Sequence, residues 1–278
     1  TLLESEPERT IAADGVLVFD AFVRDLTIAE ALPSFTIELA RQGIPPVTGT
    51  VEAIPLWSGT VDDLGGVEVD ALPVEEVLLV WRPDAALDAG TYTGFARNEL
   101  SNGFVEERPL AVTVTAGAGP AIAAPAIASA APFEYDAEVL ERACCDLLPG
   151  ACGNAPYCQP TRVRVATGFE IDAALATAQV ERAYLWIAPV VDGGVGAPVP
   201  AHGKYVRVVP YAPNWSWWTT PAYGLLPYFE VEPGERCVVF GATSFIDGST
   251  AMSEKFCATI PEPRDEARTP EFVPLDDD

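Results

Sequence analysis

Apolar residues along this chain occur in short runs that are separated by proline, glycine and acidic residues. In Phe35-Thr-Ile-Glu-Leu-Ala40 apolar and polar positions alternate, which puts successive side chains on opposite faces of a β-strand. The first half of the chain contains seven predicted strands within about 105 residues: 16–23, 35–40, 47–56, 67–70, 77–81, 91–97 and 110–114. This number of short strands is typical of one β-sandwich domain.

The second half repeats that arrangement. Its predicted strands are residues 162–166, 183–190, 205–210, 215–218, 228–231, 237–242 and 256–260. The turn sequence Glu232-Pro233-Gly234 precedes the penultimate strand, as residues 87–90 do in the first half. Proline and glycine recur throughout, while lysine and methionine are scarce, which also favours strands over helices. We therefore predict an all-β protein with two tandem sandwich domains.

Changes in composition predict the domain boundaries. Residues 1–9 are polar and acidic and are predicted to be an N-terminal tether, followed by a first domain over residues 10–117. The Ala/Gly/Pro tract 116–132 is predicted to be a semi-rigid linker, although part of it would alternatively form the first strand of the second domain. That second domain is predicted over residues 118–262, and residues 263–278 are predicted to be an acidic C-terminal tail.

One short motif carries a family resemblance. The segment Leu87-Asp-Ala-Gly-Thr-Tyr-Thr-Gly94 is similar to the E–F corner of immunoglobulin-like domains, with Asp88, Gly90 and Tyr92 at matching positions. Gly94 stands where the family has a cysteine, so the domain resembles the cysteine-free bacterial immunoglobulin-like and fibronectin type III modules. The resemblance covers about 100 residues and implies an immunoglobulin-like first sandwich. Because the second half repeats the strand arrangement, we predict two tandem immunoglobulin-like sandwiches, the second with a cysteine-rich insertion at residues 144–158. The resemblance also implies that Tyr92 is buried, with its hydroxyl bonded to backbone upstream.

Acidic residues dominate both halves of the chain. There are 41 Asp and Glu against 16 Lys and Arg, which gives a formal net charge of −25. This balance leaves no basic patch for nucleic acid or for docking on anionic lipid. The longest uncharged stretch, residues 116–133, is rich in alanine and glycine and interrupted by prolines, so no membrane span is predicted.

The six cysteines predict an oxidising compartment. We therefore expect a secreted protein, extracellular or at the cell surface, with the N-terminal tether as its point of attachment. The chain begins at Thr1 without a methionine or a signal peptide, and we take it as a mature or trimmed form. Cys237 and Cys257 fall on the last two predicted strands, which should be neighbours in a hairpin and allow a disulfide.

The other four cysteines lie close together, at Cys144, Cys145, Cys152 and Cys158. Adjacent cysteines rarely bond to each other, because the bridge strains the peptide between them. This leaves two patterns open, 144–152 with 145–158, or 144–158 with 145–152. A zinc site is disfavoured because paired Cys-x₂₋₄-Cys ligands are missing.

Candidate catalytic groups are scarce. His202 is the one histidine, and no Gly-x-Ser-x-Gly nucleophile motif accompanies it, so a Ser-His or Cys-His site is not expected. Paired carboxylates are abundant but carry no specific signal in so acidic a chain. The acidic sequences at Asp62-Asp63, Asp192 and Asp247 would suit a calcium loop, although none has the EF-hand pattern. We expect no cofactor and no enzymatic activity.

The most unusual stretch is aromatic. Tyr211 is followed by Trp215, Trp217 and Trp218, which include half of the six tryptophans. On a strand Trp215 and Trp217 would share one face, where flat rings can stack on a sugar or anchor a protein. The sequence therefore predicts a non-catalytic structural or adhesive protein that uses these four residues to bind protein subunits or a surface glycan. The alternative is a carbohydrate-binding module or a glycosidase built on the same cluster.

Overall fold

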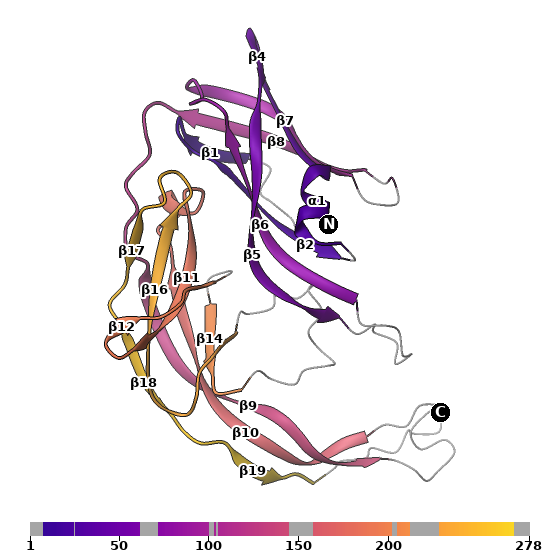
Figure 1. The fold of residues 1–278 in the computed structure, drawn as a ribbon, viewed down its shortest axis with the longest axis vertical. Coiled ribbons are helices and arrows are strands. Elements are labelled where there is room, and N and C mark those ends of the chain that lie inside the picture. The colour runs from indigo at the N-terminus through magenta and orange to yellow at the C-terminus, as the bar shows by residue number, and fades with distance from the viewer. Residues whose placement is uncertain are drawn as a thin grey trace, which may run out of the picture.

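The computed structural model describes residues 8–24, 26–61, 72–99, 103, 105–144, 158–201, 205–211 and 228–269. Over these residues strands dominate, and the helical segments are short: α1 (Ile28–Ala31), η1 (Leu32–Ser34) and η2 (Thr177–Gln179). The strands form four sheets, which stack in pairs as two sandwiches (Figure 1). The predicted all-β sandwich class is confirmed.

The first sandwich contains the strands from β1 to β8. They are β1 (Glu8–Ala12), β2 (Leu17–Arg24), β3 (Phe35–Arg41), β4 (Ile44–Val47), β5 (Gly49–Val61), β6 (Leu72–Pro83), β7 (Gly90–Glu99) and β8 (Val105–Thr115). One sheet has the order β1-β8-β7-β3-β4, and the other has the order β2-β6-β5. Alternate apolar residues of both sheets meet in one core, among them Phe19, Leu39, Trp81 and Val112.

The tyrosine expected at the corner before β7 is buried as predicted. Tyr92 is 1 % exposed, and its hydroxyl donates a hydrogen bond of 3.0 Å to the carbonyl oxygen of Asp88. Two residues later, the close approach of β3 explains why position 94 is a glycine. A Cβ at Gly94 would lie 1.7 Å from the carbonyl oxygen of Glu38 on β3, so a cysteine would not fit at this position. Glycine allows β3 and β7 to approach this closely.

The second sandwich contains the remaining strands. They are β9 (Ala126–Cys144), β10 (Cys158–Ala174), β11 (Ala183–Val191), β12 (Gly194–Val195), β13 (Val199–Pro200), β14 (Tyr205–Val209), β15 (Tyr228–Glu230), β16 (Gly234–Ser244), β17 (Thr250–Met252), β18 (Phe256–Ile260) and β19 (Arg264–Ala267). In one sheet β10 pairs with β9 on one side and with β14 and β19 on the other. In the facing sheet β16 pairs with β11, β17 and β18. Ile171, Val206, Ile187 and Phe240 join the two sheets in one core.

Several strands lie partly or wholly where none was predicted, and three of them lie at the predicted domain boundaries. β1 begins at Glu8, inside the predicted tether, and β19 lies inside the predicted tail. β9 begins at Ala126, so the second half of the predicted linker is the first strand of the second sandwich, which was the alternative interpretation. The predicted strands 67–70 and 215–218 lie outside the described residues. The domain ranges 10–117 and 118–262 stay a prediction.

The strands β9 and β10 pair from Cys144 and Cys158 down to Ala126 and Ala174. The outer part of this hairpin, residues 133–144 and 158–168, together with β19, is called the arm. In Figure 1 the arm extends to the lower right, away from the end of the hairpin that packs in the second core. It carries the cysteine-rich insertion at its far end.

The two sandwiches share an apolar contact. Strand β6 contains the unbroken apolar run Val77-Leu-Leu-Val-Trp81, so both of its faces are apolar. One face joins the first core, while Leu78 and Val80 on the other face pack with Phe245, Tyr184 and Ile246 of the second sandwich. A strand that is buried on both faces has a continuous apolar sequence, which is why apolar and polar residues do not alternate in this part of β6.

Two ion pairs border that apolar contact. Arg9 of β1 lies 3.1 Å from Glu181, which also accepts a hydrogen bond from the backbone N–H of Val18. Asp14 lies 2.8 Å from Arg182 and accepts a hydrogen bond of 3.0 Å from Gly119 N–H. These two ion pairs and the apolar contact are together called the joint. Their arginine side chains are mostly buried, with exposed fractions of 6 % and 9 % for Arg9 and Arg182.

Candidate binding surface

The predicted aromatic site lies largely outside the described residues. This applies to Trp215, Trp217 and Trp218, whereas Tyr211 is described. Tyr211 is 42 % exposed and follows the end of β14. Its side chain is thus available to a partner at the point where the tryptophan-containing segment 212–227 begins.

The backbone of Tyr211 is fixed to the arm. The hydroxyl of Tyr135 on β9 donates a hydrogen bond of 2.6 Å to the carbonyl oxygen of Tyr211 and accepts one of 3.4 Å from its N–H. Tyr135 itself is 8 % exposed and packs with Ala137, Ala166 and Val209. One buried hydroxyl therefore sets where the chain leaves β14.

A second aromatic ring supports this attachment. The rings of Phe133 and Tyr135 lie 5.5 Å apart, and the guanidinium of Arg207 on β14 lies over Phe133 at 4.8 Å from its centroid. Arg207 also pairs with Glu170 on β10 at 2.9 Å. The other end of the segment is held nearby, because Tyr228 of β15 is the parallel partner of Arg207. Both ends of segment 212–227 therefore start from the same sheet.

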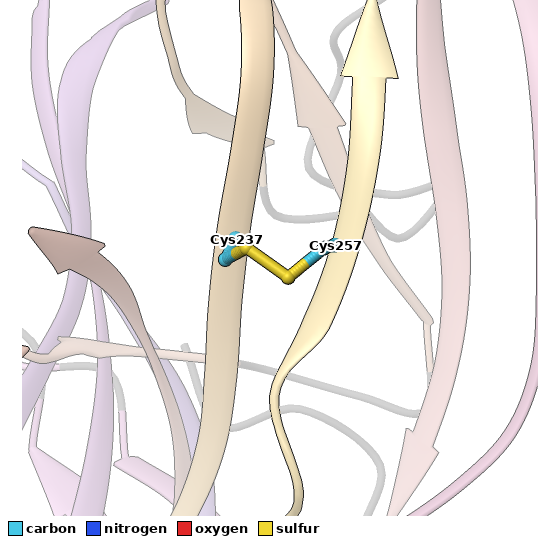
Figure 2. Close-up of a disulfide and its surroundings, with 2 residues drawn as sticks. All are labelled: Cys237 and Cys257. Carbon is cyan, nitrogen blue, oxygen red and sulfur yellow. A yellow bond between two sulfur atoms is a disulfide. The ribbon is translucent and has the colours of Figure 1, made fainter. Parts of the chain in front are cut away.

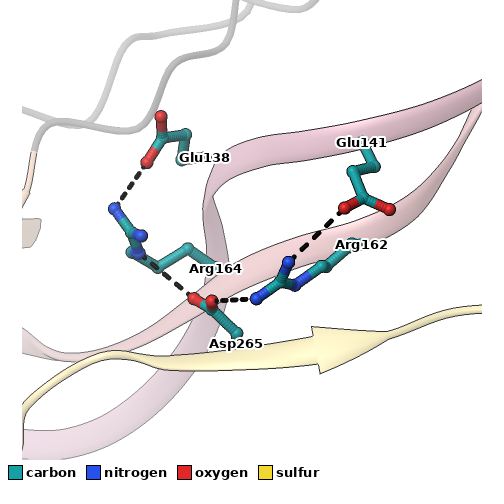
Figure 3. A network of polar contacts seen from close by, with 5 residues as sticks. All are labelled: Glu138, Glu141, Arg162, Arg164 and Asp265. Carbon is teal, nitrogen blue, oxygen red and sulfur yellow. Dashed lines mark hydrogen bonds and ion pairs between the residues drawn. The ribbon is translucent and has the colours of Figure 1, made fainter.

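The arm carries a ladder of alternating charges, shown in Figure 3. Arg164 bridges Glu138 on β9, at 2.7 Å, and Asp265 on β19, at 3.3 Å. Arg162 bridges the same Asp265, at 2.8 Å, and Glu141, at 3.4 Å. Each arginine of β10 thus joins the two neighbouring strands.

The ladder continues along β19 and beyond it. Arg264 pairs with Glu134 at 2.9 Å and with Glu266 at 2.8 Å, and Arg268 pairs with Asp136. The Arg264 guanidinium lowers the pKa of the Glu134 carboxyl below its usual range. Strand β19 is almost wholly charged, so these cross-strand pairs, rather than apolar burial, account for its place in the sheet.

One of the predicted disulfides is present. Cys237 of β16 and Cys257 of β18 are direct partners in the antiparallel ladder, and their sulfur atoms are bonded (Figure 2). In the cysteine-rich insertion, Cys145 and Cys152 lie outside the described residues. The backbones of Cys144 and Cys158 are also direct antiparallel partners, at the far end of the arm.

The acidic loops that would suit calcium form ordinary turns where they are described. Asp192 and Gly193 both have positive φ angles and form the two-residue turn between β11 and β12. The Asp247 carboxylate accepts hydrogen bonds from the hydroxyl and the N–H of Ser249, which lower its pKa to about 2. Asp62, Asp63 and His202 lie outside the described residues. Among the residues described, no group of three or more metal-binding side chains gathers.

The sequence reasoning missed the residues of the joint and of the charge ladder. Arg9 and Glu181 are 172 residues apart, and Asp14 and Arg182 are 168 apart, so no local spacing indicates either pair. A usable signal was present in β6 and in the equally unbroken run Leu185-Trp-Ile-Ala188 of β11. Such runs indicate a second buried face, and hence a contact with another part of the molecule.

No family model and no curated protein sequence matches the chain. Two solved structures show a distant likeness: "BspA_C_WT", with a TM-score of 0.21, and the wild-type C-terminal domain of the Streptococcus agalactiae AgI/II polypeptide BspA, with a TM-score of 0.20. Each is 8 % identical and covers 92 % of this chain and 96 % of its own. A likeness at this level supports no conclusion about the fold or function of this chain. No described helix is long and apolar enough to cross a membrane.

Proposed function

We propose that this chain is a non-catalytic structural or adhesive protein of the extracellular space or cell surface, in which two sandwiches act as one rigid body. The joint is the observation that carries this proposal. An apolar contact and two ion pairs, largely buried on their arginine side, hold the sandwiches in one relative orientation. A spacer or assembly subunit needs such an orientation, because it has to present a docking surface at a defined place.

The strand order of the first sandwich supports an immunoglobulin-like assignment. The partners β3, β7 and β8 occupy the places of strands C, F and G, and β2, β6 and β5 those of B, E and D. The corner at Tyr92 agrees with this arrangement, since its hydroxyl bonds to the backbone of Asp88. The fold supports a scaffold role but does not by itself define a ligand.

The docking surface in this proposal is the aromatic segment of Tyr211, Trp215, Trp217 and Trp218, and its partner is a protein subunit. Tyr211 combines an exposed ring with a backbone that Tyr135 fixes, which lowers the entropy lost on binding. The charge ladder joins β9, which carries this anchor, to β10 and β19. Aromatic residues held in this way are typical of binding hot spots.

The test uses the full chain and its Tyr211→Ala and Trp217→Ala variants, with Val191→Ala as the control. Val191 is 57 % exposed and belongs to β11, so its truncation also removes exposed apolar surface. Self-association is measured by sedimentation velocity, and binding to an array of immobilised glycans is measured in parallel. We expect association that both aromatic variants weaken by about tenfold or more and the control does not.

Two results would replace this proposal. Glycan capture that Trp217→Ala abolishes, without self-association, would establish the carbohydrate-binding alternative. Release of reducing sugar from a polysaccharide by the purified chain would establish the glycosidase. A chain that binds neither itself nor any glycan would contradict the docking role of the aromatic segment.

A further inference from the structure

The open side of the first sandwich contains an apolar groove. It has a volume of about 570 Å³ and lies between the sheet edges formed by β3 and β4 on one side and β5 on the other. Its apolar lining includes Leu32, Phe35, Ile37, Val47, Val51 and Trp81. The groove belongs to the first sandwich alone and is unrelated to the aromatic segment of the second.

One wall of the groove is a partly unpaired strand edge. β4 pairs with β3 at Leu39 and Arg41, which leaves residues 35–38 without a partner strand on that side among the residues described. The carbonyl oxygen of Glu38 faces Gly94 of β7. Because backbone groups alternate in direction along a strand, the N–H and C=O of Ile37 face the opposite edge, toward the groove. This edge can accept an added strand at Ile37, while the N–H of Phe35 already donates to the carbonyl oxygen of Leu32.

The outer face beside that edge has a separate hollow. It has a volume of about 280 Å³ and is lined by Glu38, Phe95, Arg97 and Glu107. Arg97 and Glu107 pair with each other at 2.9 Å, whereas the Glu38 carboxylate has no ion pair within the part of the chain that the structure describes. Phe95 is 45 % exposed, in the middle of the sheet. A free carboxylate beside an exposed ring suits a cationic side chain.

We propose that this edge binds an extended segment of a partner protein in which apolar and basic residues alternate, added as a strand along residues 35–38 of β3. Phe35 and Ile37 point into the sandwich, while Thr36 and Glu38 point outward. An added strand therefore places every second side chain in the apolar groove and the intervening ones on the outer face next to Glu38, with Phe95 of β7 one strand further in. The Glu38 carboxylate at this edge, in a chain with a net charge of −25, favours a basic partner segment.

The test measures binding of a fluorescent decapeptide of alternating valine and lysine to the full chain by anisotropy, at physiological salt. Glu38→Lys and Phe95→Ala should each weaken binding by about tenfold. The matched controls are Glu254→Lys and Met252→Ala, which change an exposed carboxylate and an exposed apolar side chain of the second sandwich. We expect both controls to bind like the unmodified chain.

Three further peptides separate the parts of the proposal. Replacing lysine by glutamate should remove most of the binding because it reverses the charge that faces Glu38. Replacing valine by glycine should do so because the groove is left unfilled. Placing proline at the centre should do so because proline cannot donate the backbone hydrogen bond that strand pairing needs. Equal losses in Glu38→Lys and Glu254→Lys would show general attraction to an acidic surface and overturn the proposal. So would undiminished binding of the proline peptide, or no binding of the alternating peptide. Self-association that Phe95→Ala abolishes, without peptide binding, would make a second copy the occupant instead.

Discussion

The joint and the arm use the same chemistry in different surroundings. Arg182 lies 2.8 Å from Asp14 in the joint, and Arg164 lies 2.7 Å from Glu138 on the arm. The Arg182 side chain is 9 % exposed, whereas that of Arg164 is 40 % exposed. The distances are therefore equivalent, and burial is what differs. Burial affects how much each pair contributes to stability, because water competes less for the Arg182 guanidinium than for the exposed Arg164 guanidinium.

The same contrast explains what each region does for the fold. In the joint, the guanidinium of Arg182 packs so closely on Gly119 that a Cβ there would lie 2.2 Å from it. The Arg182 carbonyl oxygen also accepts a hydrogen bond from Phe245 N–H, which belongs to the shared apolar contact. On the arm, each charge is held by other exposed charges. The joint fixes orientation, while the arm relies on many weak contacts.

Among the ion pairs, the largest effect is expected in the joint. Arg182→Ala removes a guanidinium that is 9 % exposed and leaves Asp14, whose side chain is 30 % exposed, without its partner, which should lower the free energy of unfolding by about 2 kcal/mol. The matched change on the arm, Arg164→Ala, should cost no more than about 1 kcal/mol. Denaturant unfolding of both variants measures the difference. Similar losses would show that burial does not separate the two regions.

The second prediction concerns how the far end of the arm is held. Cys144 and Cys158 are direct antiparallel partners, as Cys237 and Cys257 are in the bridge that is present. We therefore expect a Cys144–Cys158 disulfide, formed by exchange with an oxidised dithiol donor, and Cys145 paired with Cys152.

Peptide mapping under non-reducing conditions tests this pattern directly. A bridge across a loop of about 15 residues is worth about 3 kcal/mol, so the double variant Cys144→Ser, Cys158→Ser should unfold at lower denaturant concentration. A Cys144–Cys152 peptide would contradict the prediction and support the other pattern.

The strands that could be predicted from the sequence are those whose own side chains determine them. β3 and β7 alternate in polarity, and the motif around Tyr92 indicates its corner, so both were found. β9 and β19 were missed for opposite reasons. The first part of β9 is made mainly of small residues with weak strand preference, and β19 is charged at three of its four positions. Both become strands through their partner β10, which no local pattern reveals.

The binding residues were less predictable than the strands. Aromatic clustering indicated Tyr211, but its anchor Tyr135 is 76 residues away and gives no local signal. The groove beside β3 depends on how far β4 extends, and strand ends are poorly defined by sequence. Glu38 and Phe95 are ordinary residues of an alternating strand until the register places them side by side.

A smaller effect is expected inside one sandwich, away from both charged regions. Tyr92→Phe removes the hydroxyl that donates to Asp88 and should cost about 1 kcal/mol, the net value of one hydrogen bond. Thermal unfolding measures the loss, and the distance between labels on the two sandwiches should stay unchanged. A change in that distance would show that the joint is not the element that sets their orientation.

Acid should weaken the joint before it weakens the first core. The hydrogen bond from Arg182, opposed by partial burial and aided by Gly119 N–H, lowers the pKa of Asp14 below its ordinary value of 3.8. A carboxyl with a lowered pKa in the folded state contributes stability above the unfolded-state pKa and loses it as the pH falls toward the folded-state pKa. The stability difference between the unmodified chain and Asp14→Asn should therefore be constant near neutral pH and shrink below about pH 4. A difference that grows on acidification would contradict this assignment.

The smallest expected effect is the salt dependence of the two kinds of ion pair, which should differ between the arm and the joint. At 1 M salt the screening length is about 3 Å, so exposed pairs such as Arg164 with Glu138 lose most of their attraction, while enclosed pairs are screened much less. Salt also relieves the general repulsion of a chain with a net charge of −25, so absolute stabilities are not informative.

The useful quantity is the stability difference between the unmodified chain and each variant. For Arg164→Gln this difference should fall from at most about 1 kcal/mol toward zero between 0.1 M and 1 M salt. For Arg182→Gln it should persist, because the Arg182 guanidinium is mostly buried and partly buried pairs are screened much less by salt. A salt-independent loss at Arg164 would mean that the arm is held as firmly as the joint.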